Sequence, residues 1–136
     1  MLANKMVVVL DPNVPVGVAL NAAALLGVGL GSQLPDLIGE GTPDGSGGLH
    51  PGICVHPIPI LKADAARLRE LRAAAASRDG IEVHDINQVA RTSRTYEQYL
   101  ATMSGTKEED LEYVGLAIYG PRTAVNSLTG ALALYR

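Results

Sequence analysis

The chain has 136 residues, of which 47% are hydrophobic and 18% charged, and its formal net charge is −3. This length suits a single domain over residues 1–136 with a modest core. A negatively charged chain without Trp or Phe lacks the basic face and the stacking rings that nucleic-acid binders use, so we do not expect tRNA as a partner. Few charges leave little surface to solvate, which favours a homo-oligomer, such as a dimer.

Two features bear on where the protein acts. Cys54 is the only cysteine, so no intramolecular disulfide can form, and this suits a cytoplasmic protein in a reducing compartment. Residues 14–31 carry no charge, but they contain Pro15 and Asn21, and acidic residues flank them. We interpret them as a helix buried within a soluble protein and not as a membrane span.

The first predicted strand and helix lie at the N-terminus. Residues 6–10 are continuously apolar and rich in Val, which is typical of a central strand buried on both faces. Asp11 and the Pro and Asn that follow it break the run. Pro15 fits the first turn of a helix that we expect over residues 16–29.

A long irregular segment and a second strand follow. Residues 31–52 are rich in Gly and Pro, which predicts a long loop or a ragged hairpin. Residues 53–61 predict a strand, and Pro57 and Pro59 place it at a sheet edge because proline cannot donate to a ladder.

The middle of the chain alternates between helix and strand patterns. Residues 63–77 carry apolar side chains at helical spacing and end at Asp79-Gly80. Residues 81–85 alternate between two faces, as a strand does. Residues 91–103 begin as a loop and become helical from about Thr95, and Thr106 opens a capping-box pattern that predicts another short helix.

The C-terminal segment completes the pattern. Residues 113–119 predict a buried strand, Gly120-Pro121 a break, and the last residues a short helix that stops at Thr129-Gly130. The alternation of strands and helices predicts a layered α/β/α fold with a mostly parallel or mixed sheet of about four to five strands.

Polar residues follow three of the predicted strands, at the ends where open α/β sheets bind their ligands. They are Asp11 and Asn13, Asp85 and Asn87, and Tyr119, Gly120 and Arg122. If the strands are parallel, these groups converge on one edge of the sheet. The first helix starts at that edge, with Gly17 where free N–H groups favour an anion and Asn21 one turn further along.

Each of these residues also has a structural interpretation. Asp11 and Asp85 either cap helices and close turns or form a carboxylate pair for acid–base chemistry, and the sequence leaves both open. His84 and Asp85 are adjacent in a strand and point to opposite faces, so they cannot form a simple dyad. The three histidines, with His50 and His56, match no compact metal motif, so we expect no metal and no cofactor.

Short motifs along the chain resemble two families. The pieces are residues 5–10, Ala22-Ala23, Asp85 with Arg91-Thr92, residues 118–121, and Thr129-Gly130. They are similar to the type II peptidyl-tRNA hydrolase fold, in a resemblance that spans nearly the whole chain. The segments NAAALLG, PIPILKA, RTYEQY, YGP and SLTGALALYR are similar, more specifically, to the uncharacterised bacterial family called domain of unknown function 2000.

The chain departs from the hydrolase pattern where that family carries charge. Gly17-Val18-Ala19-Leu20 stands where the hydrolases have a lysine-containing Gly-Lys-Gly-Lys segment, and Ala24 stands where they have Gln. The loss of lysine removes a phosphate contact and a charge partner for the transition state. The resemblance therefore implies the fold without peptidyl-tRNA cleavage.

Three hypotheses follow, and the sequence leaves open whether the protein is an enzyme. The first is a small-molecule ligand bound at the strand-end crevice by Asp11, Asn21, Asp85 and Thr92, with Gly17 and Arg122 for an anion and Tyr119 and Gly120 nearby. The second is hydrolysis of an ester or amide, with Asp85 orienting water and Thr92 or Asn21 stabilising the oxyanion. The third is a non-catalytic homo-oligomer.

Overall fold

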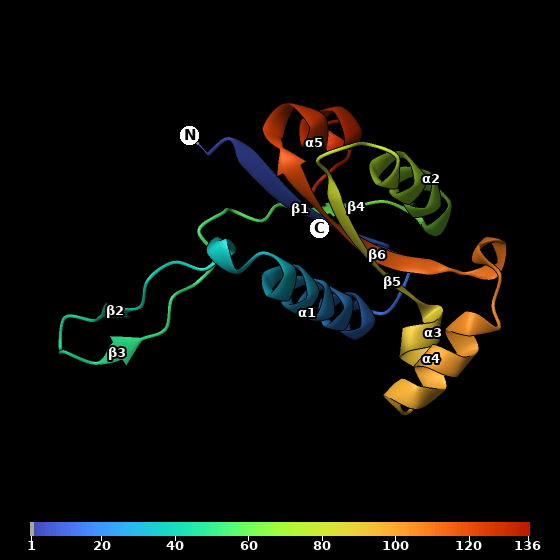
Figure 1. Ribbon diagram of the computed structural model, residues 1–136, viewed down its shortest axis with the longest axis horizontal. Helices are drawn as coiled ribbons and strands as arrows, with labels where there is room; N and C mark the ends of the chain where they lie inside the picture. Colours follow the sequence, from blue (N-terminus) through green and yellow to red (C-terminus); the bar gives the residue numbers. More distant parts are fainter. Residues whose placement is uncertain (1) are drawn as a thin grey trace.

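A four-stranded mixed sheet forms the centre of the structure, a computed structural model that describes residues 2–136 (Figure 1). Its strands, in spatial order, are β4 (Ile60–Lys62), β1 (Asn4–Leu10), β6 (Tyr113–Pro121) and β5 (Glu82–Asn87). β1 and β4 pair in parallel, whereas β6 runs antiparallel to both of its neighbours, β1 and β5. The C-terminal ends of β1, β4 and β5 therefore lie at the same edge of the sheet as the N-terminal end of β6.

Helices cover both faces of this sheet (Figure 1). The helices of the described chain are α1 (Val16–Gln33), α2 (Ala65–Ala76), α3 (Gln88–Thr92), α4 (Tyr96–Ser104) and α5 (Arg122–Thr129), with single 3₁₀ turns η1 (Pro35–Leu37) and η2 (Glu108–Asp110), and α3 and α4 lie beyond the end of β5. α1 packs on one face, and α2 and α5 pack on the other. The layered arrangement agrees with the prediction from the sequence.

The alternation of side chains along β1 produces two hydrophobic cores. Val7 and Val9 point to the α2 and α5 side, while Met6, Val8 and Leu10 point to the α1 side, and all five are buried. Successive side chains of a strand point to opposite faces, so a strand covered on both sides must be apolar throughout. The central position predicted for this strand is confirmed.

Close approach of α1 to the sheet depends on Gly115 in β6. A Cβ atom added there would lie 2.8 Å from Leu10 Cδ2, 3.2 Å from the Val9 carbonyl oxygen and 3.3 Å from Leu26 Cδ1. These separations are shorter than ordinary van der Waals contact. The absence of a side chain at this position lets Leu26 of α1 reach the sheet.

Several boundaries differ from the sequence-based expectations, each for a physical reason. The second predicted strand is shorter than residues 53–61 and consists of β4, because the prolines before it have no N–H to donate to the ladder. The expected loop after residue 90 is the end of α3, which a side-chain cap from Asn87 begins. The helix predicted from Thr106 is only the turn η2, which has no side-chain cap.

The first helix is longer and less buried than expected. α1 extends to Gln33, and only Ala19, Ala22, Leu26 and Leu30 are buried in the core. Among residues 2–136, α1 is also the one helix whose length and composition would suit a membrane span, although just 22% of its residues are buried. Its outer face is uncharged and open to solvent.

Residues 39–53 form an arm that extends away from the body of the molecule beyond the end of α1 (Figure 1). Its core is a ragged hairpin of β2 (Thr42–Pro43) and β3 (Leu49–His50). At the tip, the Asp44 carboxylate accepts hydrogen bonds from the backbone N–H groups of Ser46 (2.8 Å) and Gly48 (3.1 Å). Asp44 also lies 2.7 Å from His50 Nε2, so one carboxylate organises the whole turn.

Acidification should loosen this turn. The hydrogen bond from His50, followed by those from the Ser46 and Gly48 N–H groups, lowers the pKa of Asp44 below its ordinary value. A carboxyl group whose pKa is lower in the folded state stabilises that state above its unfolded pKa of about 3.9, and the contribution disappears as the pH falls through the folded pKa. Amide exchange at Ser46 and Gly48, followed by NMR, should therefore accelerate below about pH 4 relative to Asp44→Asn, after correction for intrinsic exchange.

An identical pH profile in the wild type and in Asp44→Asn would contradict this role for the carboxylate. Amides of the central strand β1 serve as an internal control, because they do not depend on the turn.

Candidate functional site

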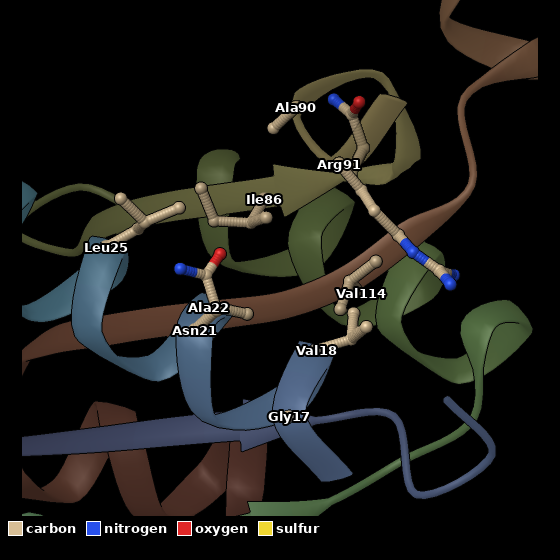
Figure 2. Close-up of a pocket in the computed structure, with 10 residues that line it drawn as sticks. Gly17, Val18, Asn21, Ala22, Leu25, Ile86, Ala90, Arg91 and Val114 are labelled. Atoms are coloured by element: carbon tan, nitrogen blue, oxygen red, sulfur yellow. The ribbon is translucent and has the colours of Figure 1, made fainter. Parts of the chain in front are cut away.

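A crevice opens at the sheet edge where β1 and β5 end, between the first half of α1 and the short helix α3 (Figure 2). Its volume is about 260 Å³. The lining residues are Gly17, Val18, Asn21, Ala22 and Leu25 from α1, Ile86 and Asn87 from β5, Ala90 and Arg91 from α3, and Val114 from β6. The floor and walls are mainly apolar, with a few polar groups at the rim.

Two side chains bring polar chemistry to this crevice from opposite sides. Asn21 directs its amide from α1 toward β5, and Arg91 extends from α3 across the mouth toward Val114 and Val18 (Figure 2). Within residues 2–136, Arg91 makes no ion pair, and its Nη1 atom has only a long, 3.5 Å hydrogen bond to Gln88 Oε1. The guanidinium therefore offers an uncompensated positive charge and several N–H donors to a bound anion.

The N-terminus of α1 adds backbone donors on the same side. Its N-cap residue is Pro15, which has no side chain able to cap the helix. The Pro15 carbonyl accepts the N–H groups of Val18 (2.9 Å) and Ala19 (3.2 Å), which leaves those of Val16 and Gly17 without a partner in the helix. A Cβ atom on Gly17 would meet nothing within 4 Å, so the space beside its Cα atom is open.

Two buried polar residues near the crevice have structural roles. Asn87 caps α3, since its Oδ1 accepts the Val89 N–H at 2.8 Å and its Nδ2 donates to Met103 Sδ at 3.5 Å. Asp11 closes the turn after β1 by accepting the Asn13 N–H at 2.9 Å. For Asp11 the structure therefore shows the turn-closing role, one of the two interpretations that the sequence left open.

Asp85 lies on the other face of the sheet from the crevice. It pairs in register with Leu116, which belongs to the α2 and α5 side, and its Oδ2 accepts a hydrogen bond of 3.0 Å from Arg72 Nε. His84 points to the α1 side, where its ring faces Gly29. The expected split between these neighbours is present, and it separates Asp85 from Asn21.

The Arg72–Asp85 pair belongs to a small structural cluster. The Arg72 guanidinium lies 5.6 Å from the centre of the Tyr113 ring. Partial burial works to lower the pKa of Arg72, but the hydrogen bond and charge of Asp85 outweigh it and raise that pKa above its ordinary value. Burial, together with a hydrogen bond to Glu108, raises the pKa of Tyr113. The cluster fastens α2 to the sheet.

The third candidate for catalysis, Thr92, is also occupied locally. Its hydroxyl donates to the Gln88 carbonyl oxygen at 3.1 Å, within α3. Of the three, only Asn21 lines the crevice, while Asp85 is bonded to Arg72 on the other face of the sheet and Thr92 is bonded within α3, so the structure does not bring them together as a catalytic set.

Tyr119, Gly120 and Arg122 lie at the opposite edge of the sheet from the crevice. The expectation that they converge with Asp11 and Gly17 is wrong, because β6 is antiparallel and ends where β1 begins. The Tyr119 hydroxyl accepts a hydrogen bond of 3.1 Å from Asn4, and Arg122 Nε donates to the Leu2 carbonyl oxygen at 3.2 Å. These residues hold the N-terminal strand in place.

A second hollow, which we call the outer groove, adjoins the crevice. Its volume is about 590 Å³, and it runs between the second half of α1 and the start of α4. It shares Leu25, Ile86 and Ala90 with the crevice, and its other lining residues are Val28, Gly29, Ser93, Arg94, Thr95, Tyr96 and Tyr99. The outer groove is largely apolar, with Arg94 as its charged residue.

Sequence reasoning missed Arg91 and the outer groove. The sequence predicts Arg91 only as part of the motif with Asp85 and Thr92, since the five residues of α3 are too few to show a helical period. The available signal was Asn87, a residue type that favours the N-cap of a helix. Three or more His, Cys, Asp or Glu side chains that could hold a metal ion do not gather anywhere in residues 2–136.

Comparisons with known proteins place the fold and the family. The family model described as "Protein of unknown function (DUF2000)" matches residues 4–136. The solved structure of a protein of unknown function from Agrobacterium tumefaciens strain C58 is 24% identical, covers 100% of both chains and superposes with a TM-score of 0.91. Comparison with curated proteins gives no match. These findings do not show the expected resemblance to type II peptidyl-tRNA hydrolases.

The geometry predicts a structural consequence of changing Asp85. Asp85→Asn should lower the free energy of unfolding by about 1 kcal/mol, because it weakens one charge-assisted hydrogen bond in a partly exposed pair. Chemical denaturation measures this change. Asp64→Asn is not a suitable control, since Asp64 caps α2, whereas Asp79→Asn changes an exposed carboxylate on the same side. An unchanged stability for Asp85→Asn would contradict the structural role.

Proposed function

We propose that this chain, which belongs to the DUF2000 family of proteins of unknown function, binds a small anionic ligand in the crevice between α1 and α3 and does not cleave peptidyl-tRNA. One observation carries the proposal. The Arg91 guanidinium, which makes no ion pair within residues 2–136, lies across an apolar crevice from the Asn21 amide.

The chemistry of the ligand follows from the lining. A carboxylate or phosphate group suits Arg91 and the backbone N–H groups at the start of α1, since a helix N-terminus carries partial positive charge. Asn21 offers both a donor and an acceptor for a second polar group. The body of the ligand would rest on Ile86, Ala22 and Val114, so a compact apolar or flat molecule fits best.

The size of the crevice supports a small molecule over a polymer. Its volume of 260 Å³ is slightly below the range of about 300–1,000 Å³ that is usual for ligand pockets. One arginine at its rim suffices for one anionic group, whereas a nucleic-acid backbone generally meets a row of cations. Residues 6–61, which include all of α1, contain no lysine or arginine.

The alternative function is hydrolysis of an ester or amide, including peptidyl-tRNA, and it rests on the motif resemblance that places Asp85 and Thr92 together. A general base must lie within hydrogen-bonding distance of the water that it activates, and the electrophile must be held nearby. Asp85 is engaged with Arg72 on one face of the sheet, and the crevice lies on the other. This separation favours binding without hydrolysis.

The binding proposal predicts a specific dependence on Arg91. Titration with inorganic phosphate and with short-chain carboxylates such as butyrate should shift the NMR resonances of the Gly17 and Val18 amides. Arg91→Gln should weaken the affinity at least tenfold, because a hydrogen bond to a charged group contributes about 1.5–3 kcal/mol. Arg78→Gln, at an exposed arginine beyond the end of α2, is the matched control and should leave the affinity unchanged. Equal loss in both variants, or shifts scattered over the surface, would contradict a built site.

A second experiment separates binding from hydrolysis. Purified protein incubated with peptidyl-tRNA should release no free tRNA above the uncatalysed rate. Turnover that falls tenfold or more in Asp85→Asn, a loss of about 1.4 kcal/mol in barrier terms, would overturn the proposal and assign a hydrolase. Folding of the variant is checked by circular dichroism.

A further inference from the structure

The arm, residues 39–53, is built as a narrow double strand. Its two limbs are joined by a hydrogen bond of 2.9 Å from the Gly39 N–H to the Ile53 carbonyl oxygen. A Cβ atom on Gly52 would overlap the Gly39 carbonyl oxygen, and one on Gly41 would lie 2.8 Å from the His50 carbonyl oxygen. Glycine on both limbs permits this close approach, and Asp44 with Gly47 (φ +87°) forms the tip.

The body of the molecule does not support the arm. Leu49 and Ile53 are 84% and 81% exposed, although both are large apolar residues. An isolated two-stranded hairpin is only marginally stable in water and normally needs a third element to pack against. A structured arm with bare apolar side chains therefore points to a partner.

The solvent-accessible surface of the chain is also larger than that of a typical folded monomer of the same mass. The accessible surface is 8233 Å² for a chain of 14.2 kDa. A monomer of that mass normally exposes about 6,800 Å², so the excess is roughly 1,400 Å². A stable protein interface takes about 800 Å² from each partner. The unsupported surface is thus large enough for one such interface.

A surface of matching character lies on α1 and in the outer groove. α1 carries no charged residue, and Val28, which lines the groove, is 73% exposed, with Leu20 and Tyr96 also exposed. Figure 1 shows the arm pointing away from α4, so the arm does not reach the outer groove of its own chain. A second copy can supply it.

Charge complementarity supports the same pairing. The arm carries Glu40 and Asp44, and no lysine or arginine lies anywhere in residues 6–61. The outer groove carries Arg94, which makes no ion pair within residues 2–136. An acidic apolar arm and a basic apolar groove attract each other and fix the orientation.

We propose that this protein forms a homodimer in which the arm of each copy lies in the outer groove of the other. A two-fold axis makes the exchange reciprocal, so both arms and both grooves are covered at once. Since the outer groove shares Leu25, Ile86 and Ala90 with the crevice, the partner's arm forms the outer wall of the ligand site. The dimer does not depend on the proposed function, because its mass is measured without any ligand.

Sedimentation velocity of the full chain over a range of concentrations tests the proposal. Wild-type protein should sediment with about twice the mass of 14.2 kDa. The double variant Leu49→Asp, Ile53→Asp should raise the dissociation constant at least tenfold, since it adds charge to the apolar contact. Leu2→Asp is the matched control, because it places the same change at an exposed leucine near α5 and should leave the mass unchanged.

A shortened variant guards against misfolding of the arm. Replacing residues 41–51 by Asn-Gly closes the two limbs with a tight turn where they already touch, and it should be monomeric with an unchanged circular dichroism spectrum of the body. A wild-type monomer at 100 µM, or a dimer that survives loss of the arm, would overturn the proposal. So would retention of the monomer on phosphatidylcholine vesicles, which would assign α1 to a lipid surface.

Discussion

The packing of β6 between β1 and β5 is the constraint on which the arrangement of the molecule depends. Eight of its nine residues are buried or partly buried, and it carries cross-strand neighbours on both sides. Because β6 is antiparallel to both neighbours, its last residues lie at the edge of the sheet where β1 begins. The polar residues that follow the predicted strands are therefore divided between two edges of the sheet and cannot form one site.

The strand alternation imposes a second division, between the two faces of the sheet. On the α2 face, the charged side chains stabilise the fold. Arg72 donates a hydrogen bond to Asp85, and its guanidinium lies over the Tyr113 ring. On the α1 face, the helix carries no charge, and the polar side chains that line the crevice are Asn21 of α1, Asn87 of β5 and Arg91 of α3. Asp85 and the crevice lie on opposite sides of a packed sheet, so the Asp85 carboxylate cannot act on a molecule held in the crevice. For the hydrolysis hypothesis this separation is a stronger objection than the loss of any single lysine.

The sequence predicted those features that depend on local periodicity. The buried run of β1, the amphipathic pattern of α2 and the opposite orientation of His84 and Asp85 all follow from side-chain spacing. The direction of β6 does not, because a strand buried on both faces is equally apolar in a parallel and an antiparallel sheet. The position of Arg91 depends on α3, a helix of five residues whose only signal is the Asn87 cap. Of the residues that the sequence analysis placed at one edge, Gly17 and Asn21 line the crevice, whereas Tyr119, Gly120 and Arg122 lie at the opposite edge.

The absence of charge on the outer face of α1 is a feature of composition, and the periodicity of the helix does not reveal it. An uncharged stretch of this length predicts burial, and the body of the chain buries only one side of the helix. The arm likewise exposes apolar side chains, since Leu49 and Ile53 are both largely open to solvent. The outer face of α1 and the arm are both exposed to solvent. The arm carries acidic residues, whereas the outer groove beside α1 carries Arg94. The reciprocal exchange that we propose would cover both at once, and it would place the crevice between α1 and α3 at the junction between two copies. If the partner's arm forms the outer wall of the crevice, a bound ligand contacts both copies, so affinity in the crevice should rise with the degree of dimerisation.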